Sequence, residues 1–251
     1  MFYKIILDLP ENLHSDLSQS CLFEDITNGR KGANLVDCVQ NVIPIVRTTT
    51  NYVLPNQKFL PVHKMIIDKI KQSIIKSSIC DEINPNIDFN NALIEMYNNK
   101  YCNMGFHSDQ ALDLDDDSYI CIFSCYDNPK NPRKLHTKNK ITNECSSITL
   151  DHNSIILFST NTNSKYLHKI ILENRELPSN WLGITYRKSK TFLKFESDIP
   201  FFLDTGKPLI LANEDTKKEF YKFRSLENSN IEYAYPEINY TISGGDIKPI
   251  I

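Results

Sequence analysis

The sequence predicts a mainly β fold with flanking helices, arranged as a sandwich or jelly roll. From Ala92 onward, short runs rich in Ile, Phe and Tyr are separated by clusters of Asn, Asp, Pro and Ser. Short apolar runs bounded by turn-forming residues are typical of strands, and many of them in succession favour a sandwich or a barrel. The predicted strands are residues 92–97, 118–126, 146–150, 154–160, 169–173, 181–187 and 191–195.

One amphipathic helix is predicted to begin at Pro61. Its apolar residues recur at helical spacing, charged residues cover the opposite face, and proline suits the first turn of a helix. Such a helix usually packs on the outside of a sheet, although a partner or a membrane surface is an alternative. The apolar positions are Met65, Ile66, Ile67, Ile70, Ile74 and Ile75.

The pattern is weaker toward both ends of the chain. Residues 1–10 (MFYKIILDLP) are apolar but interrupted by charges, so they predict a strand rather than a signal peptide. Residues 46–55 (VRTTTNYVLP) predict a strand and a turn. Near the other end, residues 213–228 predict a short capped helix, and residues 232–243 predict one or two further strands.

Length and composition favour one globular domain with extensions. The 251 residues can bury a sizeable core, and the net charge of −3 argues against a strongly basic coat for nucleic acid. No apolar run reaches the roughly 18 residues that cross a bilayer. The seven glycines form no phosphate-cradling loop. Seven cysteines without a Cys-x-x-Cys pair predict reduced thiols in an intracellular compartment, cytoplasmic or nuclear.

Two histidines and one aspartate form the most specific pattern in the chain. His107 and Asp109 are two residues apart, and residues i and i+2 of a strand point to the same face, so both can bind one metal ion. His168 is the third candidate ligand. Two imidazoles and one carboxylate are the set that holds non-haem Fe(II) with positions left open. A cysteine-rich zinc site is disfavoured because no cysteine pair has ligand spacing. The remaining histidines are predicted to be structural: His14, His63, His136 and His152.

From about Arg47 to Phe192, the order of motifs resembles the AlkB-like branch of the 2-oxoglutarate, Fe(II)-dependent oxygenases. FNNALIEMYNNKYCNMGFHSD is similar to that family's entry into its metal site, ITLDHNSIILFS resembles the strand-turn-strand before the distal histidine, and GITYRKS resembles its Thr-Phe-Arg motif. The resemblance implies a double-stranded β-helix, which is a jelly roll. It also implies a catalytic domain at 61–195, with an amino-terminal extension at 1–60 and a carboxy-terminal extension at 196–251.

The resemblance further implies Fe(II) as cofactor, with 2-oxoglutarate as cosubstrate and dioxygen as oxidant. Fe(II) would be held by the catalytic residues His107, Asp109 and His168. Arg187 and Tyr97 would bind 2-oxoglutarate, since a buried carboxylate is best matched by the bidentate fork of an arginine.

The sequence departs from this family at two positions. Trp181 stands where a second arginine is usual, and Glu95 stands where an asparagine is usual. Arg187 is therefore expected to be the sole carboxylate anchor or to be assisted by Lys190.

The implied reaction is oxidative hydroxylation or demethylation, with alkylated DNA or RNA as the leading substrate. A basic run (Lys130, Arg133, Lys134, His136, Lys138 and Lys140) predicts either phosphate contacts or an exposed hairpin tip. The acidic run from Asp113 to Asp117 predicts a solvated loop, with a mobile lid as the alternative.

Three other functions remain open from the sequence. They are a protein or small-molecule hydroxylase of the same fold, a non-catalytic binding module, and a metal-dependent hydrolase that uses the same ligands. The intact ligand set disfavours the binding module, and the absence of a further acidic or histidine base near the motif disfavours the hydrolase. The sequence does not give the oligomeric state.

Overall fold

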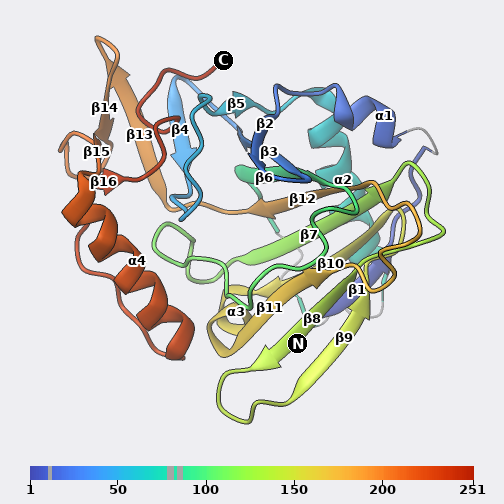
Figure 1. Ribbon diagram of the computed structural model, residues 1–251. Coiled ribbons are helices and arrows are strands. Elements are labelled where there is room, and N and C mark those ends of the chain that lie inside the picture. Colours follow the sequence, from blue (N-terminus) through green and yellow to red (C-terminus); the bar gives the residue numbers. More distant parts are fainter. Residues whose placement is uncertain (11–12, 78–81, 84–86) are drawn as a thin grey trace.

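A computed structural model describes residues 1–10, 13–77, 82–83 and 87–251 (Figure 1). Its largest sheet contains eight strands in the order β1-β10-β7-β12-β6-β3-β2, with β5 paired in parallel to β3 and every other pair antiparallel. The strands are β1 (Tyr3–Ile6), β2 (Glu24–Thr27), β3 (Arg30–Val36), β5 (Gln57–Lys58), β6 (Asn91–Tyr97), β7 (Tyr119–Tyr126), β10 (Ser154–Ser159) and β12 (Trp181–Arg187).

A second sheet faces the first. It contains β11 (Tyr166–Ile171), β8 (Lys134–Asn139) and β9 (Cys145–Thr149) in that order, all antiparallel. After β6 the chain passes repeatedly between the sheets: β7 lies in the large sheet, β8 and β9 in the small one, β10 in the large, β11 in the small and β12 in the large. This alternation makes a double-stranded β-helix, so the predicted fold class is confirmed.

The period-2 alternation of the strands sends their side chains into two cores. Phe123 and Ile184 pack on the outer face of the large sheet, against α2 (Pro61–Lys76), whereas Ile122 and Tyr126 point between the two sheets. A short helix, α1 (Leu13–Ser18), adds Leu13 and Leu17 to the outer core. The predicted helix at Pro61 is thus confirmed, with Ile66, Ile67, Ile70 and Ile74 buried, although Ile75 is exposed.

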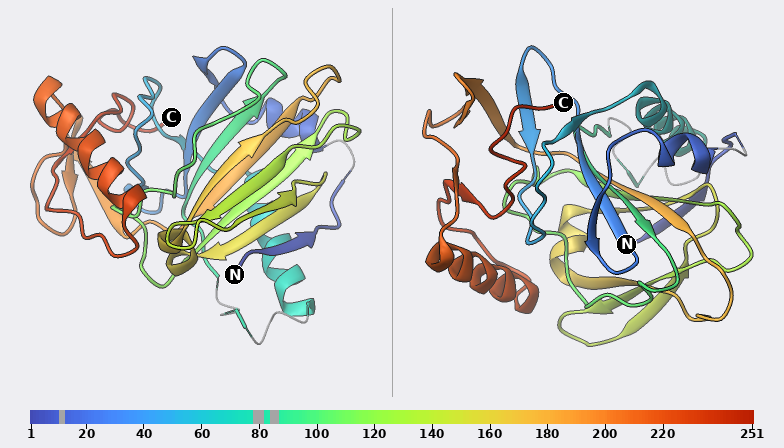
Figure 2. Two further views of the ribbon diagram at one scale, coloured as in Figure 1. Left: turned by 60° about the horizontal axis from the view of Figure 1, so that its bottom comes forward. Right: turned by 45° about the horizontal axis from the view of Figure 1, so that its top comes forward.

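A third group of elements lies at the side of the molecule away from α2 (Figures 1 and 2). It contains a small sheet of β4 (Val42–Ile45), β13 (Thr191–Glu196) and β14 (Ile199–Phe202), and the short parallel pair β15 (Ile210–Leu211) and β16 (Tyr240–Thr241). Helix α4 (Glu214–Ser229) begins at the N-cap Asn213, whose Oδ1 accepts from Asp215 N and Thr216 N. The predicted helix over 213–228 is confirmed.

Several predictions about local structure were wrong. The strand predicted at 46–55 is absent. Strand β4 ends at Ile45, and residues 46–55 form a loop. Three of the six residues of the basic run, Lys134, His136 and Lys138, lie in strand β8 rather than in a hairpin tip. Helix α3 (Thr160–Lys165) was not predicted. Every strand predicted from Ala92 to Phe195 is present, and β1 matches the predicted amino-terminal strand.

No helix in the described part of the chain has the length and apolar content needed to cross a membrane. Six cysteines of the described residues carry free thiols; Cys80 lies outside them.

Candidate metal centre

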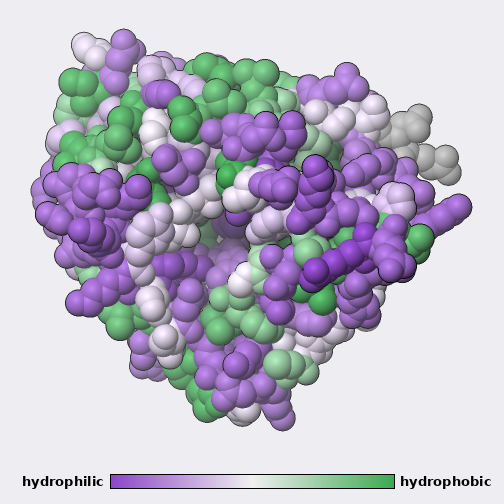
Figure 3. Space-filling view, viewed as in Figure 1, coloured by the Kyte–Doolittle hydropathy of each residue, from purple (hydrophilic) through white to green (hydrophobic). Residues whose placement is uncertain are grey.

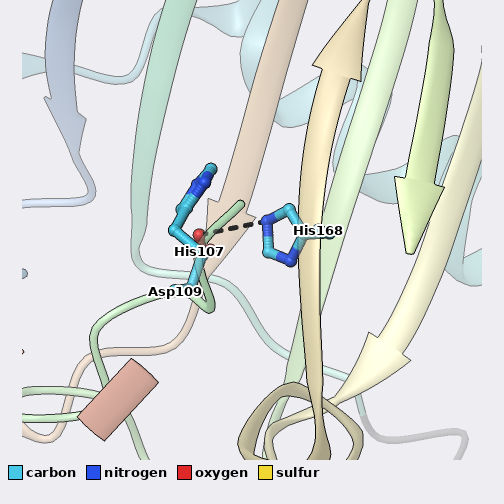
Figure 4. A group of neighbouring side chains, drawn as sticks. All are labelled: His107, Asp109 and His168. Atoms are coloured by element: carbon cyan, nitrogen blue, oxygen red, sulfur yellow. Dashed lines mark ion pairs between the residues drawn. The ribbon is translucent and has the colours of Figure 1, made fainter. Parts of the chain in front are cut away.

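His107, Asp109 and His168 lie together at one end of the space between the two sheets (Figure 4). One ligand atom from each lies within 4.8 Å of the others. The backbones of His107 and His168 form an antiparallel bridge, with His107 N donating to His168 O at 3.0 Å and His168 N donating to His107 O at 2.6 Å. This bridge extends the small sheet beyond β11 and fixes the separation of two candidate ligands that are far apart in sequence.

The tautomer of His107 follows from its neighbour. Its Nδ1 lies 3.0 Å from the carbonyl oxygen of Gly105, and a carbonyl only accepts, so Nδ1 carries the proton. The lone pair of Nε2 is then left for a metal. Burial, together with repulsion from His168, lowers the pKa of His107 to about 3, so this imidazole is neutral at physiological pH. A neutral imidazole is the form that binds metals.

Asp109 is buried and held as an anion. Burial alone would raise its pKa, but the Arg187 guanidinium and His168 outweigh burial and hold the pKa well below the ordinary value. Arg187 Nε donates to Asp109 Oδ2 at 2.8 Å. The other oxygen, Oδ1, lies 3.7 Å from His168 Nε2 (Figure 4). That gap is too long for a hydrogen bond and short enough for both atoms to bind one ion at about 2.1 Å each.

The donor set, two imidazole nitrogens and one carboxylate oxygen, fits a divalent transition metal. A buried polar atom without a hydrogen-bond partner, His168 Nδ1, belongs to the same group of side chains. The predicted ligands are therefore brought together with compatible donors and separations.

The loop that carries His107 and Asp109 is held in place by side chains from two helices, which act as a clamp. Asn163 of α3 forms a two-way contact with the backbone of Asp109, accepting from its N and donating to its O, both at 2.7 Å. Asn228 of α4 accepts from Ser108 N at 3.0 Å and from Ser108 Oγ at 3.2 Å. Such outer contacts orient the groups that hold a metal.

Two further α4 side chains complete this clamp. Arg224 donates to Ser108 O and pairs with Glu227, whose Oε1 accepts from Ala111 N at 2.8 Å. Sequence reasoning missed Asn163, Arg224, Glu227 and Asn228, because no motif or spacing shows which loop a distant helix contacts.

A cavity of about 320 Å³ adjoins the three candidate ligands. Figure 3 shows a hollow near the middle of the face that Figure 1 presents. The cavity is lined by the small sheet through His168 and Ile170, by the large sheet through Leu93 and Ile122, and by the loop after β4. Arg187 and Tyr97, the two residues predicted to bind a carboxylate, both line it.

The end of the cavity near Tyr97 contains a network of charged and hydroxyl groups. Tyr97 donates its hydroxyl proton to Glu95 Oε2 at 2.7 Å, and Arg30 of β3 donates through Nε to Glu95 Oε1 at 2.7 Å. Glu95 is a second carboxylate lining the cavity, contrary to the expectation that no further acidic group lies near the motif. Each oxygen of the Glu95 carboxylate therefore accepts one hydrogen bond, Oε2 from Tyr97 and Oε1 from Arg30.

Other predicted candidates lie away from this cavity. Lys190, the proposed assistant of Arg187, is exposed and pairs with Asp116 at 2.8 Å. Asp113 was predicted in a solvated loop, but it is fully buried and pairs with Arg47 at 2.7 Å. The sequence expectation therefore fails for both residues.

Part of the basic run is used inside the protein. Arg133 is fully buried and donates to the carbonyl oxygens of Tyr101 and Asn98 at 2.7 and 2.8 Å. Lys140 Nζ donates to the carbonyl oxygens at the end of α4. At the surface, Lys134 pairs with Glu173 at 2.7 Å, and Lys130 is exposed.

No protein-family profile matches the sequence, and no curated protein sequence matches it. Among solved structures, OsALKBH1 is similar with a TM-score of 0.46 and 13% identity, over 71% of this chain and 88% of that one. A prolyl-4-hydroxylase from Pseudomonas putida has a TM-score of 0.41 and 11% identity, over 74% of this chain and 92% of that one. Similarity at this level carries over neither a substrate nor a residue's role, so the function has to follow from this chain's own site.

Proposed function

We propose that this protein is an Fe(II)- and 2-oxoglutarate-dependent dioxygenase that hydroxylates or demethylates its substrate. The observation that carries the proposal is the grouping of His107, Asp109 and His168, with ligand atoms within 4.8 Å, beside a cavity lined by arginines. Two imidazoles and a carboxylate leave coordination positions open, and the arginines suit a dicarboxylate. The resemblance of the motifs to AlkB-like oxygenases supports the same assignment.

Each residue has a distinct part in this proposal. The three ligands present two imidazole nitrogens and one carboxylate to the ion, and Arg187 keeps that carboxylate ionised. When bound with 2-oxoglutarate and dioxygen, Fe(II) supplies the oxidising chemistry that yields succinate, carbon dioxide and a hydroxylated substrate carbon. The sheets on either side position the reactants and limit access of water. If the hydroxylated carbon is an N-methyl group, formaldehyde leaves and the bare amine remains.

Alkylated nucleic acid remains the leading substrate on the strength of the resemblance, although Arg133 and Lys140 of the basic run are engaged in contacts within the protein. A protein or small-molecule hydroxylase is the alternative within the same chemistry. Incubating the protein with methylated oligonucleotides and with candidate peptides, and measuring the succinate released above the substrate-free rate, separates these two.

The central experiment is an anaerobic titration of Fe(II) in the presence of 2-oxoglutarate. We expect a weak visible charge-transfer band in the wild-type protein, and its loss in Asp109→Ala and His168→Ala. His14→Ala serves as the matched control, because it removes an imidazole outside the candidate metal centre and should leave the band unchanged.

The other functions predict different outcomes. A metal-dependent hydrolase would bind a divalent ion without this band and without consuming 2-oxoglutarate, whereas a binding module would show neither turnover nor succinate. A wild-type protein that binds neither Fe(II) nor 2-oxoglutarate would contradict the proposal.

A further inference from the structure

The cavity beside the candidate metal centre has a metal end and an opposite end, and each contains an arginine paired with a carboxylate. At the metal end, Arg187 is engaged with Asp109. The opposite end is formed by one row of residues on three neighbouring strands, in which Tyr97 of β6 lies between Arg30 of β3 and Trp181 of β12. If the protein binds 2-oxoglutarate, as the proposed function requires, one carboxylate chelates the metal and the other must be matched elsewhere in this cavity.

The β12 side of the row provides no cation. The Trp181 ring lies over Gly183, so closely that a Cβ at Gly183 would fall 2.0 Å from the ring. The ring also packs against Tyr97 in a tilted arrangement, with centroids 4.7 Å apart. Trp181 therefore fills the space through which a side chain of β12 would reach the far end of the cavity.

On the β3 side of the same row, Arg30 provides a cation. Arg30 lines the cavity, and its side chain is only 16% exposed. Its Nε and Nη2 lie 2.7 and 2.6 Å from Glu95 Oε1, and its guanidinium lies 5.7 Å from the centre of the Tyr101 ring. These contacts hold a planar, permanently charged fork at the end of the cavity opposite the metal.

The other arginines of the cavity are engaged near the metal. Arg187 donates to Asp109, and Arg224 contacts Ser108 O and Glu227 on the metal loop. Along β12, the row of Glu95 lies four residues from Arg187, about 13 Å at 3.3 Å per residue. Arg30 itself pairs with Tyr97, but its guanidinium reaches Glu95, so the guanidinium groups of Arg30 and Arg187 are held by carboxylates at different levels of the cavity.

We propose that Arg30 binds the distal carboxylate of 2-oxoglutarate, and that Glu95 competes with that carboxylate for the same guanidinium. This inference rests on the proposed function. It gives Arg30 of β3 the part of the arginine that this chain lacks at Trp181. Arg30 and Trp181 lie on opposite sides of Tyr97. Before 2-oxoglutarate binds, Glu95 would hold the Arg30 guanidinium in place. Glu95 would also weaken the affinity for a dicarboxylate, because its negative charge repels the distal carboxylate.

The test compares two ligands that differ in the distal carboxylate. Calorimetry in the presence of Mn(II) measures the binding of 2-oxoglutarate and of 2-oxobutyrate, which has the same metal-binding end and no second carboxylate. In Arg30→Gln we expect 2-oxoglutarate to bind about 10- to 100-fold more weakly, the usual loss for a charge-assisted hydrogen bond. Binding of 2-oxobutyrate should stay within about twofold, since that ligand does not contact Arg30. Arg175→Gln, which removes an exposed loop arginine, is the matched control and should change neither.

A second variant has an effect of the opposite sign. Glu95→Gln keeps one acceptor oxygen for Arg30, and its amide NH2 can donate to the Tyr97 hydroxyl oxygen. It removes the competing charge, so 2-oxoglutarate should bind several-fold more tightly while 2-oxobutyrate is unaffected. This variant tests the inference even if Arg30→Gln does not fold.

The outcomes separate this inference from the proposed function. Wild-type protein that binds Mn(II) but neither 2-oxo acid overturns both. If the wild type binds 2-oxoglutarate, equal weakening of both ligands in Arg30→Gln would show a purely structural role, and unchanged affinity would place the anchor elsewhere. Either result overturns the assignment of Arg30 alone.

Discussion

His63 shows how burial of one imidazole makes the whole protein sensitive to acid. It is fully buried, its Nδ1 accepts from Leu60 N at 3.0 Å, and its Nε2 lies 2.9 Å from Ser20 Oγ. Burial lowers its pKa from 6.5 to about 4. Between these two pH values the unfolded chain binds a proton that the folded chain does not, so lowering the pH favours unfolding.

We therefore predict that the free energy of unfolding falls as the pH drops from 6.5 to 4, with up to about 3 kcal/mol from this residue at 1.4 kcal/mol per unit. His63→Gln should flatten this dependence, because glutamine at this helix position can still accept from the N-cap amide and does not titrate. Urea unfolding at several pH values measures both slopes. Other buried histidines remain in the variant, so the difference between the two proteins isolates His63, and equal slopes would contradict the prediction.

At the candidate site, the two-residue spacing pointed to His107 and Asp109, but the strand assumed for that spacing is absent. His107 is an isolated bridge residue and Asp109 lies in the loop that follows, so the loop and its contacts, rather than a strand period, bring the two side chains together. Arg30 and Asn163 were missed for a different reason: Arg30 contacts Glu95 across 65 residues of chain, and Asn163 contacts Asp109 across 54. Such pairs depend on strand register and on loop packing, which a single sequence does not specify.

At the scale of elements, α4 acts as a clamp on the metal loop. Asn228, near its carboxy-terminal end, accepts two hydrogen bonds from Ser108, the residue between the two nearer ligands. We predict that Asn228→Ala weakens Fe(II) or Mn(II) binding by about 10- to 100-fold, the range seen when outer contacts of a metal site are removed. Metal titration by calorimetry measures the loss.

The matched control lies at the other end of the same helix. Asn213 is the N-cap of α4, and Asn213→Ala should cost about 1 kcal/mol of stability while leaving metal affinity unchanged. If both variants weaken metal binding equally, the helix as a whole, rather than the contact with Ser108, is responsible.

The elements themselves were predictable where hydrophobic periodicity was strong. Strand β7 has buried residues on both faces and reads as a continuous apolar run. Strand β8 was missed because its sequence, KLHTKN, is basic and polar, and only pairing with β9 and β11 on either side makes it a strand. Its apolar contribution is one fully buried residue, Leu135. Tertiary pairing thus overrode a weak local preference.

At the scale of the whole molecule, one buried ion pair joins segments from both ends of the chain. Arg47 lies just after β4, and its backbone N and guanidinium both donate to Asp113, with the backbone contact at 2.7 Å. Arg47 Nη1 also donates to Ile238 O at 2.7 Å, near the carboxy terminus. Thr191 of β13 donates to the same carboxylate at 2.7 Å. The Arg47–Asp113 pair is therefore a junction of four separate segments.

Removing this carboxylate leaves a guanidinium buried without its counterion. We predict that Asp113→Ala lowers the free energy of unfolding by about 3–5 kcal/mol. Asp116→Ala, in the same acidic run, should cost less than about 1 kcal/mol, because its pair with Lys190 is exposed. Urea unfolding followed by Trp181 fluorescence and by circular dichroism measures both losses.

Since Asp113 connects β4, β13 and the carboxy-terminal segment to the metal loop, the two probes should report one shared transition in the wild type. Separate transitions would show that the carboxy-terminal segment unfolds independently of the jelly roll, and equal losses in the two variants would contradict the predicted contribution of the buried pair.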